Sequence, residues 1–192
     1  MRGLAEGPDP ELERLYTCEL GLEAVPDHYA ALTGLRTLDL GHNALRRLPD
    51  LSALTRLEIL YVHDNALMEL PALPSSLTYL NVSENPLGDL PALSLPSLIE
   101  LRALAVGLSA LPALELPALR ELHLRRNMFR FVPEVVRELR ELRLLDMRAN
   151  HLTSVPDWLV ELPRLEKLDL RWNRVYDPPP GLRERGCVVL LE

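Results

Sequence analysis

Leucines alternate with polar residues along this chain and return at a fixed spacing. In one unit, Leu35, Leu38 and Leu40 are followed by Asn43, and Leu48 comes immediately before a proline. Side chains of a strand point to alternate faces, so the leucine pair at 38 and 40 predicts a short strand with one apolar face. Each unit is therefore expected to contribute one short strand, followed by a turn.

The unit occurs eight times and predicts a stacked repeat architecture. Its first leucine falls at Leu12, Leu35, Leu57, Leu77, Leu98, Leu119, Leu142 and Leu165. A fixed period of this size is typical of solenoids, in which neighbouring units stack their strands into a parallel sheet about 4.8 Å apart. We divide the chain into an N-terminal tail (1–11), a repeat array (12–180) and a C-terminal capping strand (181–192).

The pattern resembles the leucine-rich-repeat superfamily over about residues 12–180. The short units between Leu57 and Pro117 are similar to bacterial effector-type repeats, and the longer units at both ends are similar to Ras-group (scribble-like) repeats. The resemblance implies an α/β solenoid of about eight repeats. Its concave face would carry a curved parallel sheet, and its convex face short helical turns or extended segments.

The resemblance also implies a role for the asparagine that follows each strand. Its side-chain amide is expected to bond backbone groups at the turn, so that the asparagines form a buried ladder. Six units carry it, at Asn43, Asn65, Asn85, Asn127, Asn150 and Asn173. Leu20 and Val106 replace it in the first and fifth units. Leu20 lies in an end unit, whereas Val106 requires a local rearrangement inside the array.

The convex side is predicted to change along the chain. Helical turns are expected at 27–32, 133–139 and 157–162, with Pro133 at a first helical position, where its missing N–H costs little. The shorter, proline-rich central units favour extended segments there. The sequence Pro178-Pro-Pro-Gly181 predicts a turn, and 186–191 a final strand beside the eighth unit.

Charge and composition narrow the class of partner. The net charge of −7 disfavours nucleic acid as a partner, although residues 1–100 carry −9 and residues 101–192 carry +2. No apolar run approaches the roughly 18 residues of a membrane helix, so no membrane contact is expected. Cys18 and Cys187 lie at opposite ends of the array and are expected to be free thiols. We therefore expect a cytoplasmic protein, with a secreted effector as the alternative.

Common catalytic motifs are missing from the sequence, so no enzymatic activity and no cofactor are expected. One alternative is a nucleophilic Cys18, which would make the chain a cysteine-dependent enzyme. A second alternative is a metal site built from His42, His63, Asp64 and Glu84. Solvated side chains at the rim of the sheet are the favoured explanation of that second group, because its spacings are irregular and no paired histidine motif is present, and we predict no metal site.

Residues beside the inward-facing leucines are predicted to face the concave surface. An aromatic and aliphatic group there resembles an interface anchor, and a series of arginines could pair with carboxylates. The predicted protein-binding residues are Ile59, Tyr61, His63, Tyr79, Arg102, Leu104, His123, Arg125, Arg148 and Arg171. Two alternatives stay open. In the first, the apolar residues are ordinary exposed ones; in the second, the arginines pair internally with Glu100, Glu121, Asp146 and Asp169.

The sequence therefore predicts a non-catalytic protein–protein interaction module. It would bind a protein partner of unknown identity through its concave face. The repeat portion of a secreted bacterial effector is the alternative within the same class. Irregular periods and the interrupted asparagine ladder argue against a designed consensus scaffold.

Overall fold

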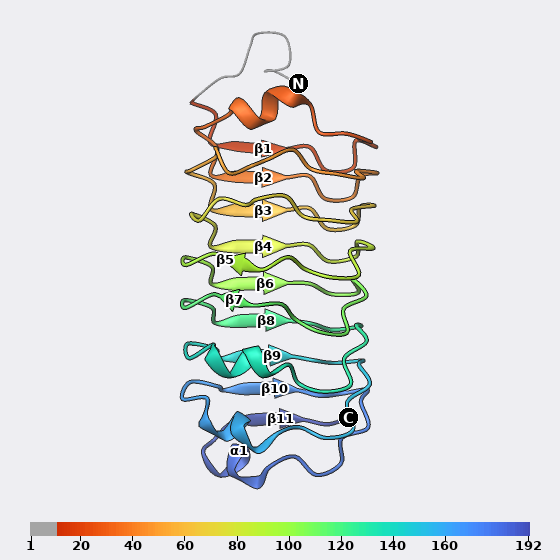
Figure 1. Ribbon diagram of the computed structural model, residues 1–192, viewed down its shortest axis with the longest axis vertical. Helices are drawn as coiled ribbons and strands as arrows, with labels where there is room; N and C mark the ends of the chain where they lie inside the picture. Colours follow the sequence, from red (N-terminus) through yellow and green to blue (C-terminus); the bar gives the residue numbers. More distant parts are fainter. Residues whose placement is uncertain (1–10) are drawn as a thin grey trace.

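Nine parallel strands stack along the length of the molecule in the computed structural model, which describes residues 11–192 (Figure 1). All but one of the predicted tail residues lie outside this range. The strands are β1 (Arg14–Tyr16), β2 (Thr37–Asp39), β3 (Ile59–Tyr61), β4 (Tyr79–Asn81), β6 (Glu100–Arg102), β8 (Glu121–His123), β9 (Leu144–Asp146), β10 (Lys167–Asp169) and β11 (Val188–Leu190). The predicted solenoid of eight units with a C-terminal capping strand is confirmed.

The central leucine of each repeat strand holds the sheet in register. Leu38 pairs with Leu60, Leu60 with Leu80, and the same match continues to Leu168. From Leu38 to Leu168 these leucines are fully buried. The flanking residues of each strand point the other way, and we call the surface that they form the sheet face. It is the face that the sequence predicts as concave.

The asparagine ladder is confirmed. The Asn150 amide donates to the carbonyl oxygens of Leu124 (3.0 Å) and Met147 (2.9 Å), and its Oδ1 accepts from the N–H of Phe129 (3.1 Å). Each of the six amides bonds the backbone of its own turn and of the preceding unit in this way. Neighbouring turns are therefore joined by side-chain bonds where the sheet ladder ends.

Val106 interrupts the ladder, and two glycines accommodate the interruption. The N–H of Gly88 donates to the backbone carbonyl of Val106 (2.9 Å), a bond that reaches toward the following unit. Both Gly88 and Gly107 adopt positive φ angles (+70° and +84°). A Cβ on Gly107 would lie 3.7 Å from the Cα of Gly88. The predicted rearrangement is present, and left-handed glycines make it possible.

The convex side follows the predicted change from helical to extended segments. Short 3-10 helices η1 (Asp27–Ala31), η2 (Glu134–Glu138) and η3 (Asp157–Glu161) occupy the longer units. Pro133 lies one position before the predicted one and caps η2 with an extended backbone. In the central units, β5 (Leu93–Ser94) and β7 (Leu114–Glu115) pair as a second small parallel sheet, which the sequence does not predict.

The C-terminal end closes the stack with a helix and a strand. The predicted turn at 178–181 is wrong in part, because Pro180–Glu184 form the short helix α1. Proline suits the first turn of a helix, where its missing N–H needs no partner. The final strand is confirmed, since β11 pairs with β10 in parallel. No helix in residues 11–192 is long and apolar enough to cross a membrane.

The residue before the asparagine position is left-handed in all eight units, with φ between 51° and 60°. Side chains with a Cβ are disfavoured there.

We expect Ala149→Gly to raise the free energy of unfolding by about 0.5–1 kcal/mol. The matched change Ala44→Gly, at a residue without positive φ, should lower it. Urea denaturation of both variants measures these changes in the free energy of unfolding. A loss of stability in Ala149→Gly would contradict the idea that alanine is strained in the left-handed conformation at this position.

Candidate functional site

All ten predicted binding residues lie on the sheet face and are partly exposed. They flank the buried leucines of the strands or follow the strand ends. The structure separates them into two regions. We call Ile59, Tyr61, His63 and Tyr79, on and beside β3 and β4, the aromatic patch. The arginines and His123 lie farther along the sheet, among carboxylates.

Neighbouring rings of the aromatic patch contact one another in tilted and edge-on arrangements. The ring centroids of Tyr61 and Tyr79 lie 5.0 Å apart, and that of His63 lies 6.1 Å from that of Tyr61. Burial raises the pKa of Tyr79 to about 12, so its hydroxyl stays protonated at neutral pH. Rings held by their neighbours lose little freedom on binding, which suits an interface anchor.

His63 and His42 form a pair at the edge of this patch. Their Nε2 atoms lie 3.2 Å apart, and the Nδ1 of His42 lies 2.7 Å from a carboxylate oxygen of Asp64. That hydrogen bond raises the pKa of His42, whereas burial, followed by the charge of His42, lowers the pKa of His63. A Cβ on Gly41 would lie 2.5 Å from the His63 ring, so glycine makes room for this imidazole.

The predicted alternative of a metal site at this edge is only partly assembled. Among the described residues, no three of His42, His63, Asp64 and Glu84 bring their ligand atoms within 4.8 Å of one another. Glu84 is exposed and belongs to the following turn. The group therefore has the geometry of a hydrogen-bonded histidine pair with one carboxylate.

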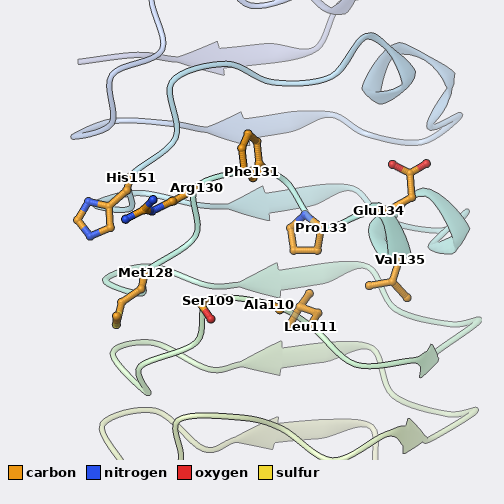
Figure 2. A pocket seen from close by; sticks show the side chains of 10 residues that line it. All are labelled: Ser109, Ala110, Leu111, Met128, Arg130, Phe131, Pro133, Glu134, Val135 and His151. Carbon is orange, nitrogen blue, oxygen red and sulfur yellow. The ribbon is translucent and has the colours of Figure 1, made fainter.

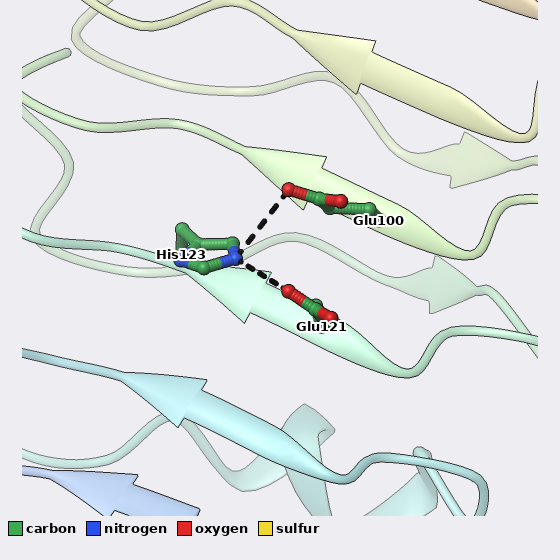
Figure 3. Close-up of side chains that lie close together, drawn as sticks. All are labelled: Glu100, Glu121 and His123. Carbon is green, nitrogen blue, oxygen red and sulfur yellow. Dashed lines mark hydrogen bonds and ion pairs between the residues drawn. The ribbon is translucent and has the colours of Figure 1, made fainter.

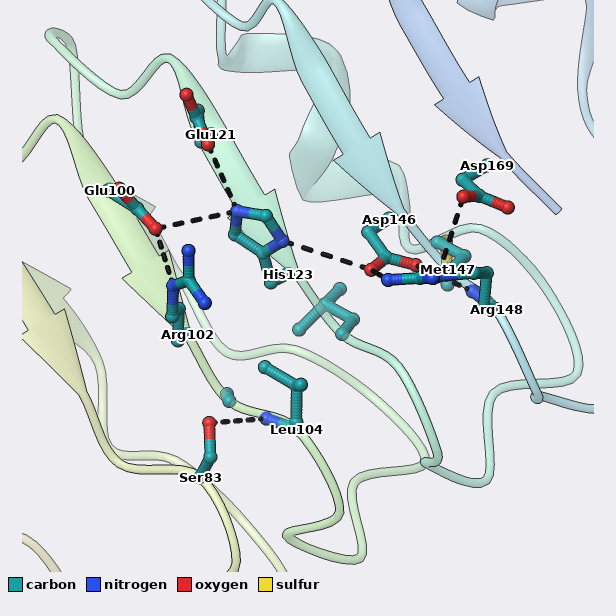
Figure 4. A network of polar contacts seen from close by, with 12 residues as sticks. Ser83, Glu100, Arg102, Leu104, Glu121, His123, Asp146, Met147, Arg148 and Asp169 are labelled. Carbon is teal, nitrogen blue, oxygen red and sulfur yellow. Dashed lines mark hydrogen bonds and ion pairs between the residues drawn. The ribbon is translucent and has the colours of Figure 1, made fainter. Parts of the chain in front are cut away.

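Three of the four arginines pair internally, as the open alternative had it. Arg148 binds the buried Asp146 through Nε (2.9 Å) and through a terminal nitrogen (2.6 Å). Arg171 contacts Asp169 in the same way, at 3.0 and 2.7 Å, whereas Arg102 contacts Glu100 through Nε (2.5 Å). Figure 4 shows the network around Arg102 and Arg148. Each acid lies two residues before its arginine, which puts both on one face of a strand.

Arg125 differs from the other three arginines. The residue two positions before it is His123, and the side chain forms no ion pair within the described part of the chain. Its Nε is buried and has no hydrogen-bond partner. Arg102 is also set apart, because it pairs in register with His123 rather than with an arginine. The arginines therefore do not form one continuous row.

His123 lies among three carboxylates that the sequence does not predict as a unit. Its Nε2 is 3.1 Å from Glu121 and 3.6 Å from Glu100, as Figure 3 shows. Its Nδ1 faces Asp146 at 3.8 Å (Figure 4). Burial alone would raise the pKa of the Asp146 carboxyl, but the interaction with His123 and the hydrogen bonds from Arg148 outweigh burial and hold that pKa well below its usual range. The registered pair Glu100 and Glu121 is the sequence signal for this cluster.

A depression away from the sheet face is a second exposed surface. It has a volume of about 710 Å³ and lies between the fifth, sixth and seventh units (Figure 2). Phe131 (72% exposed) and Met128 (53%) line it, opposite the small side chains of Ser109 and Ala110. None of these residues is among the predicted binding residues.

Both cysteines are free, as predicted. Cys187 is buried, and burial raises the pKa of its thiol, which disfavours a reactive thiolate. Cys18 is partly exposed beside the end of β1. Within residues 11–192, no imidazole or carboxylate hydrogen-bonds to its thiol.

Three family models match the chain. A model described as "Leucine rich repeat" matches residues 117–175, one described as "Leucine Rich repeats (2 copies)" matches 33–75, and a further "Leucine Rich repeat" model matches 74–90. No curated protein sequence matches the chain. The matched ranges fall inside the predicted repeat array.

Solved structures agree with these matches. YopM, a leucine-rich effector protein of Yersinia pestis, is 31% identical with a TM-score of 0.77, over 88% of this chain and 46% of that one. A leucine-rich-repeat protein of Leptospira interrogans is 24% identical (TM-score 0.66, 94% and 55% covered). Human 5T4, a trophoblast glycoprotein, is also 24% identical (TM-score 0.74, 98% and 81% covered).

At 24% identity, the Leptospira and human structures bear on the fold alone. The chain spans about half the length of the two bacterial proteins. The family models agree with the repeat pattern, and the YopM structure agrees with the solenoid fold. The chain is a leucine-rich-repeat protein with bacterial effector-like relatives.

Proposed function

We propose that this chain binds a protein partner through its sheet face, with the aromatic patch as the anchor and Arg125 as a carboxylate-binding group. The leucine-rich-repeat fold supports a protein-interaction module, and proteins of this fold are generally non-enzymatic scaffolds. The observation that carries the proposal is the unpaired Arg125, whose buried Nε has no acceptor within the described residues.

The cost of an unsatisfied donor favours a carboxylate from a partner. A buried polar group without a hydrogen bond costs about 1–3 kcal/mol, and a group that accepts from it recovers this free energy. Guanidinium groups bind carboxylates with two parallel hydrogen bonds. Arg125 is the arginine of this series that can bind a carboxylate of a partner. The other three already contact carboxylates within the chain: Arg102, Arg148 and Arg171.

The aromatic patch supplies the apolar part of the surface. Tyr79 lies two strands from the sixth unit, about 10 Å along the stack, and Arg125 lies four residues beyond Glu121, the position in register with Tyr79, which adds about 13 Å along the strand direction. Nine strands span about 38 Å, enough for an interface of roughly 800 Å² on each partner. A partner with an apolar side chain and a carboxylate about 16 Å apart fits both groups.

Affinity capture from a lysate of the source organism tests the surface when variants are run in parallel. We expect the wild type to recover a protein that Tyr61→Ala and Arg125→Glu fail to recover. With the recovered protein purified, Tyr61→Ala should raise the Kd about 30-fold, because an anchor residue contributes about 2 kcal/mol. Isothermal titration calorimetry gives that number directly.

Phe131→Ser is the matched control, since it removes an exposed aromatic ring from the depression outside the sheet face. It should leave recovery unchanged. Loss of the partner in Phe131→Ser, with retention in Tyr61→Ala and Arg125→Glu, would move the interface to the depression and contradict the proposal.

A secreted bacterial effector is the second candidate function. It rests on the likeness to YopM, at 31% identity over 88% of this chain. The two unpaired cysteines suit the reducing cytoplasm, and we place the module in that compartment, in a bacterium or in a cell that a bacterium targets. A partner that is recovered from eukaryotic but not bacterial lysate favours the effector.

A further inference from the structure

We propose that Glu100, Glu121 and His123 form a binding site for a divalent transition metal, with Zn²⁺ as the best-fitting ion. One oxygen of each glutamate and the Nε2 of His123 all lie within 4.8 Å of one another on the sheet face. These residues differ from the group that the sequence raised as a metal-site alternative. The inference does not depend on the sheet face binding a protein.

The distances match a tetrahedral ion. Zinc lies 2.0–2.1 Å from its nitrogen and oxygen ligands, so two ligands of a tetrahedral site are about 3.3 Å apart. The Nε2 of His123 is 3.1 Å from Glu121 Oε2 and 3.6 Å from Glu100 Oε1. Both values lie close to that separation, and the two glutamate oxygens lie within 4.8 Å of each other.

The backbone fixes the three ligands in place. Glu100 and Glu121 are directly opposite in the register of β6 and β8, and His123 follows Glu121 on the same face of β8 (Figure 3). Two carboxylates directly opposite each other in neighbouring strands repel. A divalent cation between them removes this repulsion and neutralises both charges.

The surroundings have the form of an outer ligand shell. Metal-bound histidines usually present their second ring nitrogen to a carboxylate, which orients the ring. The Nδ1 of His123 faces the buried Asp146 at 3.8 Å (Figure 4). Arg102 donates to Glu100 Oε1, and a carboxylate oxygen has lone pairs enough to accept this bond and bind an ion. Arg102 therefore positions Glu100.

The donor set favours zinc over the hard cations. One imidazole and two carboxylates suit Zn²⁺, whereas Mg²⁺ prefers an octahedral shell of oxygens. Three protein ligands leave one tetrahedral position, and Glu121 is 43% exposed, so that position opens toward solvent. Water or a ligand from another molecule can occupy it.

Competition with a chromophoric chelator tests the site on the full chain, with Zn²⁺ alone as the probe. We expect one equivalent to bind. His123→Gln and Glu121→Gln should each weaken binding by more than the roughly 10- to 100-fold that loss of an outer-shell partner costs. Glu121→Gln keeps the shape of a side chain whose one hydrogen bond is to His123, so it tests the site even if His123→Gln misfolds. Mg²⁺ should not compete.

His63→Gln is the matched control, because the His42–His63 pair is another place on this face where zinc could bind. It should retain full affinity. The assignment would be overturned if the wild type bound no zinc or if Mg²⁺ competed. It would also be overturned if His63→Gln lost binding or if all variants bound zinc equally well.

Discussion

Asn127→Ala is expected to lower the free energy of unfolding by about 3–5 kcal/mol. The Asn127 amide accepts from the N–H groups of Val106 (3.2 Å) and Leu108 (3.0 Å) and donates to the carbonyl of Ala103 (2.8 Å). The asparagine is 5% exposed, so water cannot replace these bonds. Each buried group left without a partner costs roughly 1–3 kcal/mol. Chemical denaturation followed by circular dichroism measures the loss.

Asn127 is the ladder asparagine whose loss is expected to lower the stability most, because it lies beside the interruption at Val106. The ladder is already interrupted in the fifth unit, so the N–H of Val106 depends on the side chain of the following unit. Native domains are stable by only about 5–15 kcal/mol, and a loss of this size is a large part of the total. The transition of the variant should also broaden, because the units on either side of the sixth become less strongly coupled.

Asn81→Ala is the control for Asn127→Ala. Asn81 lies in β4 on the sheet face, where its side chain accepts one hydrogen bond, from the N–H of Ser83 (3.1 Å). That change should cost no more than about 1 kcal/mol. Equal effects of the two substitutions would show that the ladder amides do not stabilise the stack.

Most of the fold could be predicted from the sequence, because each unit of a solenoid packs against the units directly before and after it. Leu60 pairs with Leu38 and Leu80, its counterparts in the neighbouring units, so one unit's pattern specifies the whole sheet. Elements that depart from the repeat pattern were harder to predict. The helix at Pro180–Glu184 begins at the last of three prolines that favour a turn, and it forms because Leu182 is buried against the last units. Tertiary packing decides that element.

The candidate site was only partly predictable, since repeat position determines which face a residue occupies but not what its side chain binds. All ten predicted residues lie on the sheet face. Whether an arginine forms an ion pair depends on the residue two positions before it. Asp146 occupies that position for Arg148 and binds it, whereas a histidine occupies it for Arg125. The depression beside Phe131 depends on the small residues Ser109 and Ala110 of the preceding unit, which no single unit reveals.

Asp146→Asn is expected to lower the free energy of unfolding by about 2–3 kcal/mol at pH 7. The carboxylate is 4% exposed and accepts from the Nε, a terminal nitrogen and the backbone N–H of Arg148. Asparagine keeps the shape but removes the negative charge that pairs with this half-buried guanidinium. Asp169, 3.4 Å from Arg148, limits the loss because it offers a second carboxylate.

The same carboxylate predicts how stability depends on pH. The folded-state pKa of Asp146 lies well below the value of about 3.9 that an unfolded chain has. Its contribution is therefore fully present above about pH 5 and is lost as the pH falls through 3.9 toward the folded-state pKa. Below pH 5 the wild type should lose stability more steeply than Asp146→Asn, so that their unfolding free energies converge. Asp89→Asn removes the same charge from an exposed position and should keep the steep wild-type profile. Parallel profiles for wild type and Asp146→Asn in acid would contradict a role for this carboxylate in the stability of the sheet.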